Sequence, residues 1–114
     1  MIQNDIFFAD QQLELEEVEA GKLTRKIRAR GGKLMMVEVF FKPGAIGYEH
    51  EHPHEQLCYC LAGEFVFTVG SEAKTLVAGD SVYVPASTLH GATCINEGRL
   101  LDIFTPQRED FIKS

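Results

Sequence analysis

Residues 34–69 read LMMVEVFFKPGAIGYEHEHPHEQLCYCLAGEFVFTV, and this stretch decides the fold. It contains short runs of β-branched and aromatic residues separated by glycine and proline breaks, which is the pattern of β-strands joined by turns. The runs of this kind in the whole chain are 34–41, 56–61, 64–69, 81–84 and 99–104. Their close spacing predicts an all-β fold, either a sandwich or a barrel.

Two segments are ambiguous. The glutamates and leucines of 11–27 suit a helix, but Leu13 and Leu15 alternate as they would in a strand, and we favour extended structure there. The tail QREDFIKS (107–114) predicts a short helical turn. A chain of 114 residues has the size of one domain, which we place at 1–114 with a barrel core at about 33–105.

The net charge of −6 argues against nucleic acid and anionic membranes as partners, because both would repel the protein. The first residues lack a basic start followed by an apolar run, and no apolar stretch reaches the roughly 18 residues that a membrane helix needs. We therefore expect a soluble, cytoplasmic protein.

Cys58, Cys60 and Cys94 are an odd number of cysteines without a secretory context, which argues against a disulfide framework. Cys58 and Cys60 would share one face of a strand. We favour small buried thiols in a reducing compartment over metal ligands.

Three of the four histidines fall within YEHEHPHEQ (48–56). Alternate side chains of a strand share a face, so His50 and His52 would present two imidazoles to one point, which is metal-ligand geometry. Gln56 has the same parity, although Pro53 is expected to interrupt the strand. His90 follows a strand and a proline turn far downstream. A single histidine is more often an ordinary polar residue than a ligand, but this grouping reverses that expectation.

These segments resemble the two sequence motifs of the cupin superfamily. In the first motif a glutamine stands where most cupins have a glutamate, and its positions are Gly44, His50, His52, Gln56 and Gly63. In the second motif Ser87 replaces a glycine and Cys94 an asparagine, while Gly79, Pro85 and His90 fit. The resemblance implies a single-domain cupin, a double-stranded β-helix or jelly-roll barrel.

From TRKI (24–27) to REDF (108–111), the chain is similar to the small pectin-degradation cupins of the KdgF type. That resemblance implies a metal site made by His50, His52, Gln56 and His90, and usually a homodimer. It implies a small anionic sugar as substrate, an unsaturated monouronate released by pectate or alginate lyases. By strand parity alone, Asp102 could lie inside or outside the barrel. The family pattern DxFxxxR implies that Asp102, Phe104 and Arg108 lie near the metal.

Three neutral imidazoles and a neutral carboxamide would leave a divalent cation its full charge and hence strong Lewis acidity. Nickel, manganese, iron, cobalt and zinc all suit such ligands. The expected reaction converts a 4,5-unsaturated monouronate to the linear 5-keto-4-deoxyuronate by ring opening and tautomerisation. Asp102 would transfer protons, Arg108 would grip a carboxylate and Phe104 would form an apolar wall.

Other interpretations stay open at this point. A metal-dependent cupin dioxygenase, a non-catalytic sugar- or metal-binding cupin and a barrel with a structural zinc are the alternatives. His54 and Glu55 follow Pro53 and would lie either in a solvated loop or at the mouth of the site. Arg25 and Lys26 would either add positive charge at that mouth or be ordinary surface residues.

Overall fold

The computed structural model describes residues 5–50 and 52–112, and for residues 48–50 it describes the backbone alone. Within those ranges no helix is long and apolar enough to cross a membrane. The elements in chain order are η1 (Asp10–Gln12), β1 (Glu16–Glu19), β2 (Leu23–Gly31), β3 (Leu34–Phe41), β4 (Ile46–His50), β5 (Glu55–Val69), β6 (Glu72–Val77), β7 (Ser81–Val84), β8 (His90–Thr105) and η2 (Glu109–Phe111). The all-β prediction is confirmed.

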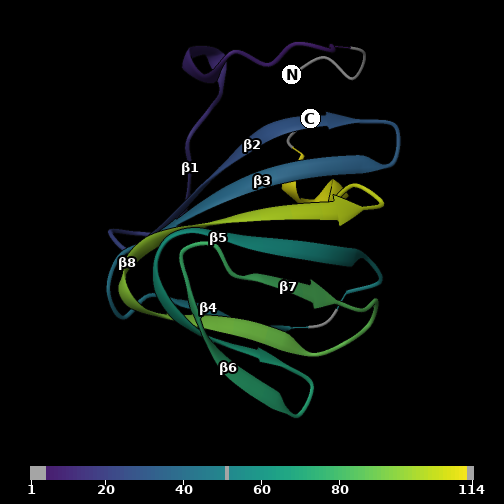
Figure 1. Cartoon of the computed structure of the whole chain (residues 1–114). Helices are drawn as coiled ribbons and strands as arrows, with labels where there is room; N and C mark the ends of the chain where they lie inside the picture. The colour runs from purple at the N-terminus through teal and green to yellow at the C-terminus, as the bar shows by residue number, and fades with distance from the viewer. Residues whose placement is uncertain (1–4, 51, 113–114) are drawn as a thin grey trace.

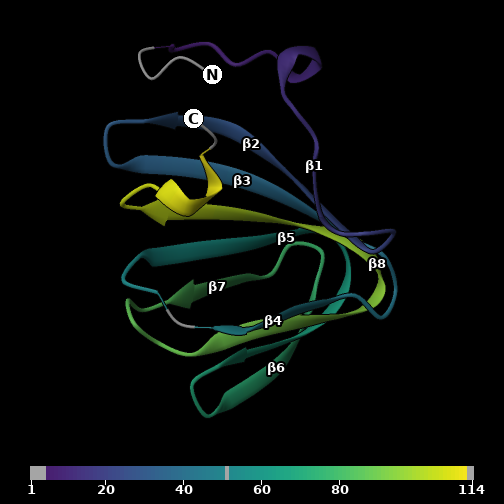
Figure 2. The same cartoon turned by 180° about the vertical axis from the view of Figure 1, so that it is seen from behind.

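Two long strands, β5 and β8, form the centre of the fold. They pair antiparallel along most of their length, and the sheet runs in the order β1-β2-β3-β8-β5-β6, with β4 joined to β8 and β7 joined to β5. Each long strand bends, so that one half lies in the upper layer of Figure 1 and the other half lies in the lower layer. The layers close into a jelly-roll barrel, which Figure 2 shows from behind.

Two glycines allow this bend. Gly63 in β5 has a φ of +89°, which is left-handed backbone that favours glycine, and the register of β5 against β8 shifts on both sides of it. On β8, a Cβ added to Gly98 would lie 2.1 Å from the carbonyl oxygen of Ala62. Both strands therefore turn the corner where their backbones are in closest contact.

Several strand boundaries differ from the sequence expectation. Residues 56–61 and 64–69 were expected as two strands, but they form the single strand β5, because Gly63 bends the chain without ending its pairing. Strand 99–104 is the second half of β8. The first half was not predicted, because its small and polar residues do not form a β-branched or aromatic run. Within segment 11–27, residues 16–19 and 23–27 are strand, as favoured, whereas residues 11–12 belong to the 3-10 turn η1. The short turn expected in the tail is η2.

The barrel interior follows the strand alternation. Along β5, Cys58 and Cys60 point inward and are fully buried, whereas Tyr59 between them points outward. All three cysteines are free and buried, as favoured, and burial raises the pKa of each thiol. The rings of Phe41 and Phe65 pack edge to face at 4.9 Å in the same core.

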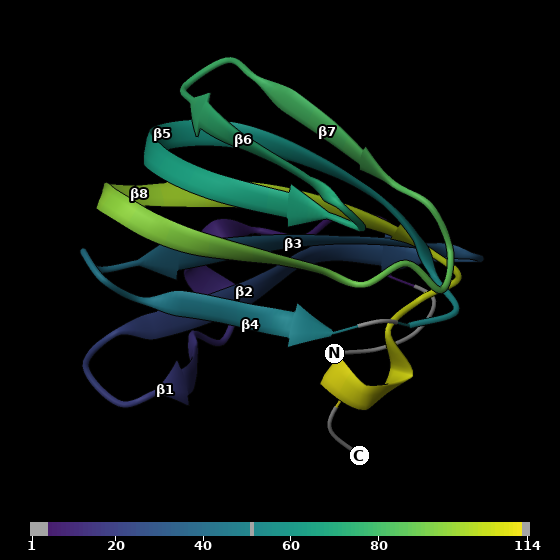
Figure 3. The same cartoon turned by 90° about the horizontal axis from the view of Figure 1, so that it is seen from below.

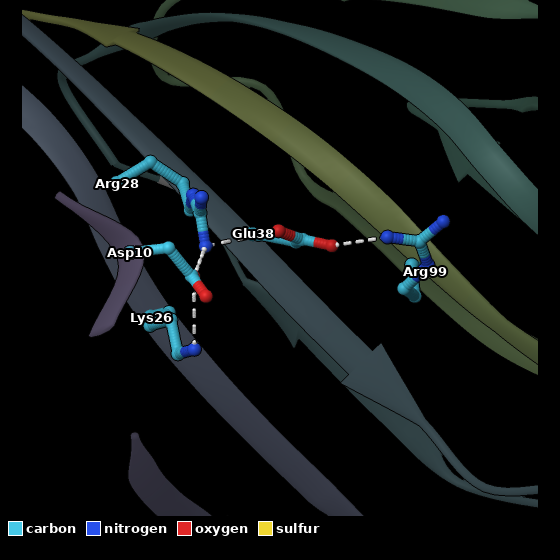
Figure 4. A network of polar contacts seen from close by, with 5 residues as sticks. All are labelled: Asp10, Lys26, Arg28, Glu38 and Arg99. Atoms are coloured by element: carbon cyan, nitrogen blue, oxygen red, sulfur yellow. Dashed lines mark hydrogen bonds and ion pairs between the residues drawn. The ribbon is translucent and has the colours of Figure 1, made fainter. Parts of the chain in front are cut away.

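A polar network lies on the outer face of β2, β3 and β8 (Figure 4). Asp10 accepts hydrogen bonds from Lys26 at 3.1 Å and from Arg28 at 2.5 Å, and the buried Glu38 accepts one from Arg99 at 2.7 Å. Nη1 of Arg28 also lies 3.6 Å from Oε1 of Glu38, so Arg28 connects the contacts of Asp10 with those of Glu38. This network attaches the N-terminal segment to the sheet, and Lys26 therefore lies on the outer face of the barrel.

We expect Gly98→Ala to lower the free energy of unfolding by at least about 2 kcal/mol, because the new methyl group meets backbone that cannot rotate away. Urea unfolding measures the change. Gly31→Ala is the matched control, since a Cβ there meets no atom within 4 Å, and its effect should stay within about 0.5 kcal/mol. Equal effects of the two substitutions would show that the corner does not need a glycine.

Candidate metal centre and its cavity

A cavity of about 900 Å³ opens inside the barrel. The loop before β5, the loop before β8 and the segment after β8 meet at one end of the molecule (Figure 3). The polar residues that line the cavity include Arg25, His52, His54, Gln56, His90, Asp102 and Arg108. The cavity thus has the size and the mixed lining typical of a small-molecule site.

The first histidine motif spans a strand end and a bend. Strand β4 ends at His50, whose backbone pairs with that of His90 on β8, while the side chain of His50 is outside the described part of the structure. His52 lies beyond the strand, so the expectation that both histidines alternate on one strand is wrong. The backbone N–H of Ser87 donates to the carbonyl oxygen of His52 at 2.7 Å, which ties the bend to the loop before β8.

His52 and His90 both line the cavity and lie next to each other, with their rings edge to face and the ring centroids 4.8 Å apart. Nδ1 of His52 lies 3.2 Å from the carbonyl oxygen of His54, and Nδ1 of His90 lies 2.8 Å from that of Thr88. A carbonyl oxygen only accepts, so each Nδ1 holds the proton and each Nε2 keeps its lone pair. This is the tautomer that a histidine needs to coordinate a cation through Nε2.

Gln56 is the third side chain, after His52 and His90, that could bind a metal in the cavity. Its Nε2 donates a hydrogen bond of 3.0 Å to Oδ1 of Asp102, and its Oε1 is buried without a hydrogen-bond partner among the described residues. Two imidazole nitrogens and one amide oxygen fit a divalent transition metal. Among the described side chains, no three His, Cys, Asp or Glu residues form such a group, since one donor is an amide and His50 is outside the description.

Asp102 lies inside the barrel. On β8 it shares the inward face with Leu100 and Phe104, and all three line the cavity, which decides the question that strand parity left open. Burial raises the pKa of Asp102 to about 6, although its hydrogen bonds with Cys58 and Gln56 and the charge of Arg108 work in the opposite direction. A carboxyl group with a pKa in this range can both accept and release a proton near neutral pH.

Arg108 follows β8 and is buried beside the ring of Phe104, with its guanidinium carbon 5.1 Å from the ring centroid. Its Nε and Nη2 donate to the two carboxylate oxygens of Asp110 at 3.0 and 2.8 Å. These bonds lower the pKa of Asp110. Asp110 therefore occupies the Nε side of the guanidinium, and its two bonds do not use the N–H groups of Nη1 or the second N–H group of Nη2.

Comparison with known proteins agrees with this architecture. The Cupin domain family matches residues 37–104, more than half of the chain. Pectin degradation protein KdgF of Dickeya dadantii is 38% identical over 108 residues, which cover 93% of this chain and 97% of that protein. The chain belongs to the KdgF group of cupins.

Solved structures of similar proteins extend the match. An RmlC-like cupin from Shewanella frigidimarina is 41% identical with a TM-score of 0.90, over 97% of this chain and all of that one. KdgF from Halomonas sp. is 35% identical with a TM-score of 0.87, over 94% of this chain and all of that one. The cupin fold commonly binds a divalent metal, and oxalate decarboxylase of Bacillus subtilis, a cupin-fold neighbour at 19% identity and a TM-score of 0.78 over 89% of this chain and 29% of that one, has Mn(II) centres.

In this KdgF-type cupin, both departures in the second motif are accommodated. Ser87 adopts the left-handed backbone conformation, with a φ of +57°, that a glycine would adopt more easily. Cys94 is buried, and its Sγ donates to the carbonyl oxygen of Asn96 at 3.0 Å. Ser87 thus lies in the turn before β8, and Cys94 lies within β8, where its backbone pairs with Gly44 and Ala45.

Phe111 was not among the expected site residues, and the position of Arg25 relative to the site had been left open. The Phe111 ring lies in η2 against the cavity, with the guanidinium carbons of Arg25 and Arg108 at 3.7 and 4.2 Å from its centroid. Arg25 is also paired with Glu16. Alternation along β2 could have separated Arg25, inside, from Lys26, outside, but no sequence signal connected Phe111 with either arginine.

His54 and Glu55 also separate. The His54 ring lines the cavity, 5.1 Å from the His52 ring, and its Nε2 lies 3.1 Å from the carbonyl oxygen of Gln107. Glu55 is exposed and accepts a hydrogen bond of 2.5 Å from the hydroxyl of Tyr83. His54 therefore follows the interpretation that placed it at the site, whereas Glu55 lies on the surface.

We expect Phe111→Leu to lower the free energy of unfolding by about 1–3 kcal/mol, because it removes both cation–π contacts together with part of the half-buried ring. Phe111→Tyr keeps the aromatic ring, so its free energy of unfolding should fall much less. Thermal and urea unfolding of the two variants tests this difference. If both variants are as stable as the unaltered protein, the contacts to Phe111 do not hold the two arginines.

Proposed function

We propose that this protein converts 4,5-unsaturated monouronates, formed in pectin or alginate breakdown, to the linear 5-keto-4-deoxyuronate. The observation that supports this most is the contact between Gln56 and Asp102, which places a proton-transfer group next to a set of ligand atoms in one cavity. The likeness to a protein named for pectin degradation supports the same reaction.

His50, His52, Gln56 and His90 are the metal ligands in this proposal. The ring orientation of His52 and His90 and the buried Oε1 of Gln56 support it. When bound, a divalent cation such as nickel, manganese, iron, cobalt or zinc would supply Lewis acidity for the negative charge that develops on the carbon-5 oxygen.

Asp102 would move the protons. It takes the proton of the anomeric hydroxyl while the bond between carbon 1 and the ring oxygen breaks, and the bonding electrons pass to that oxygen. Carbon 1 becomes an aldehyde, and the oxygen on carbon 5 is left as an enolate. Asp102 then returns its proton to carbon 4, the electrons of the enolate oxygen form the carbonyl, and carbon 5 becomes the ketone. The raised pKa of Asp102 suits both transfers. No other reactant is needed, because the product is an isomer of the substrate.

Arg108 and Phe104 would hold the sugar. Asp110 occupies two N–H groups of Arg108, and the N–H groups that remain at the Nη1–Nη2 end can bind a substrate carboxylate. The buried ring of Phe104 forms an apolar wall of the cavity between His52 and Arg108. The two side chains thus limit how a sugar ring can lie beside Asp102.

The assignment is tested by the ultraviolet absorbance of the conjugated double bond in freshly prepared unsaturated galacturonate. We expect a decay well above the spontaneous rate, which stops after chelation and returns with a divalent metal, since Lewis acidity is lost and regained. The same assay with the alginate-derived monouronate compares the two sources. Decay no faster than in buffer with every metal tried would refute the proposal, and oxygen consumption with a diketone would then favour a dioxygenase.

The protein would act as a single domain over residues 1–114, in the cytoplasm and as a homodimer. Its buried free thiols suit a reducing compartment. Leu57, 52% exposed, lies opposite Tyr83, also 52% exposed, on the outer face of β5 and β7, with Tyr59 two residues further along β5. An apolar face of this kind supports association with a second copy.

Light scattering of the eluting protein should therefore give twice the mass of 12.8 kDa. Leu57→Lys should shift the mass toward the monomer, because it places a charge in the apolar face. Leu34→Lys is the control, since Leu34 is also exposed, at 60%, and lies at the far end of β3. A monomer at all concentrations would contradict the proposal.

A further inference from the structure

The hydrogen bond between Gln56 and Asp102 joins two strands inside the cavity. Gln56 is the second residue of β5 and is 5% exposed, and its backbone lies opposite Phe104 of β8. Asp102 is two residues earlier on β8, so it faces the same interior. The 3.0 Å bond between Gln56 Nε2 and Asp102 Oδ1 therefore runs diagonally between neighbouring strands.

A carboxamide has two unlike ends, and this contact fixes which end faces which way. Nε2 of Gln56 donates to Oδ1 of Asp102, so the NH₂ end of the amide faces Asp102. Oε1 must then face away from Asp102, and it is the buried atom that has no hydrogen-bond partner among the described residues. The amide is thus oriented by a protein contact alone.

A glutamate at this position could not make the same contact. Both of its oxygens accept, so an ionised glutamate would place one carboxylate against another at the distance of a hydrogen bond. Cupins commonly have a glutamate at this motif position, and this chain has Asp102 on the neighbouring strand. The glutamine at position 56 and the aspartate at position 102 are chemically linked, because the side chain at position 56 must donate a hydrogen bond to Asp102.

We propose that Gln56 is the positioning residue of Asp102, and that it stands in place of the usual glutamate because its NH₂ group must hold that carboxylate while its oxygen faces the metal position. This inference rests on the proposed function for the role of Asp102. It goes beyond the ligand role of Gln56, since it assigns the other end of the amide a separate task and makes the two residues an interdependent pair.

The test is a double-mutant cycle with Gln56→Glu, Asp102→Asn and the two combined, studied first without metal at a pH above 7. Gln56→Glu should lower the folding equilibrium constant by roughly 10-fold to 100-fold, the usual range for losing a hydrogen bond to a charged group. Adding Asp102→Asn should recover most of that loss, because the NH₂ group of the introduced asparagine can donate to the introduced glutamate. Urea unfolding measures all four proteins.

Gln107 provides the matched control. It is also a buried glutamine, and its Nε2 donates to the carbonyl oxygen of Gly32 at 2.8 Å, away from Asp102. Gln107→Glu removes the donor to Gly32 and keeps an oxygen that accepts from Arg30, and whatever its effect on stability, Asp102→Asn should not change that effect. The rescue of Gln56→Glu alone would then show that the coupling belongs to the Gln56–Asp102 pair.

A second measurement tests whether the site still binds a metal. Titration with Ni²⁺ alone, by calorimetry, should show binding by the combined variant, in which the introduced glutamate keeps an oxygen ligand and the introduced asparagine donates to it. In the uronate assay, Asp102→Asn and the combined variant should both lose at least about 100-fold in kcat, the usual contribution of a proton-transfer group. Recovery of folding without recovery of turnover separates positioning from catalysis.

The proposal is wrong if the combined variant is no more stable than Gln56→Glu, including the case in which neither folds. It is equally wrong if Gln56→Glu has no effect on stability, which would mean that Asp102 does not need the NH₂ group of Gln56. If the unaltered protein converts no uronate but the stability coupling is present, the pairing holds and only the proposed function fails.

Discussion

The antiparallel pairing of β5 with β8 is the interaction on which the rest of the structure depends. These strands contribute to both layers of the barrel. Strands β3 and β4 pair directly with β8, β6 and β7 pair with β5, and β2 reaches β8 through β3. The two strands stay paired where they bend, because Gly63 and Gly98 let the two backbones approach without side chains between them. Without that close approach the two layers could not share strands.

The same pairing builds the site. One half of β8 begins with His90 and the other half contains Asp102, and β5 supplies Gln56 next to Asp102. Residues that are 46 positions apart in the chain are thereby brought to hydrogen-bond distance. Strand alternation then selects which side chains reach the cavity, since Asp102 points inward while its neighbours Leu101 and Ile103 do not line it. The chemistry of the cavity is therefore a consequence of sheet register.

Charge is arranged differently on the two sides of the β2–β3–β8 sheet. Inside, Arg25 and Arg108 stack on Phe111 and are balanced by Glu16 and Asp110. Outside, Lys26 and Arg28 pair with Asp10 on the N-terminal segment. Adjacent basic residues on β2 thus belong to separate networks, and the two arginines in the cavity each have a carboxylate partner before any anionic ligand arrives.

The sequence by itself determined the all-β class, the extended segments, the buried cysteines and the membership in the cupin family, because these depend on residue type and on spacing along the chain. It also pointed to His52, Gln56, His90 and Asp102 through motif spacing. Only the tertiary structure decided that β5 is one bent strand, that Asp102 lies inside, that Asp110 occupies Arg108 and that Phe111 lies between two arginines. These features depend on contacts between residues on different elements and on the local turn of η2, and neither propensity nor periodicity records which side chains meet across a fold.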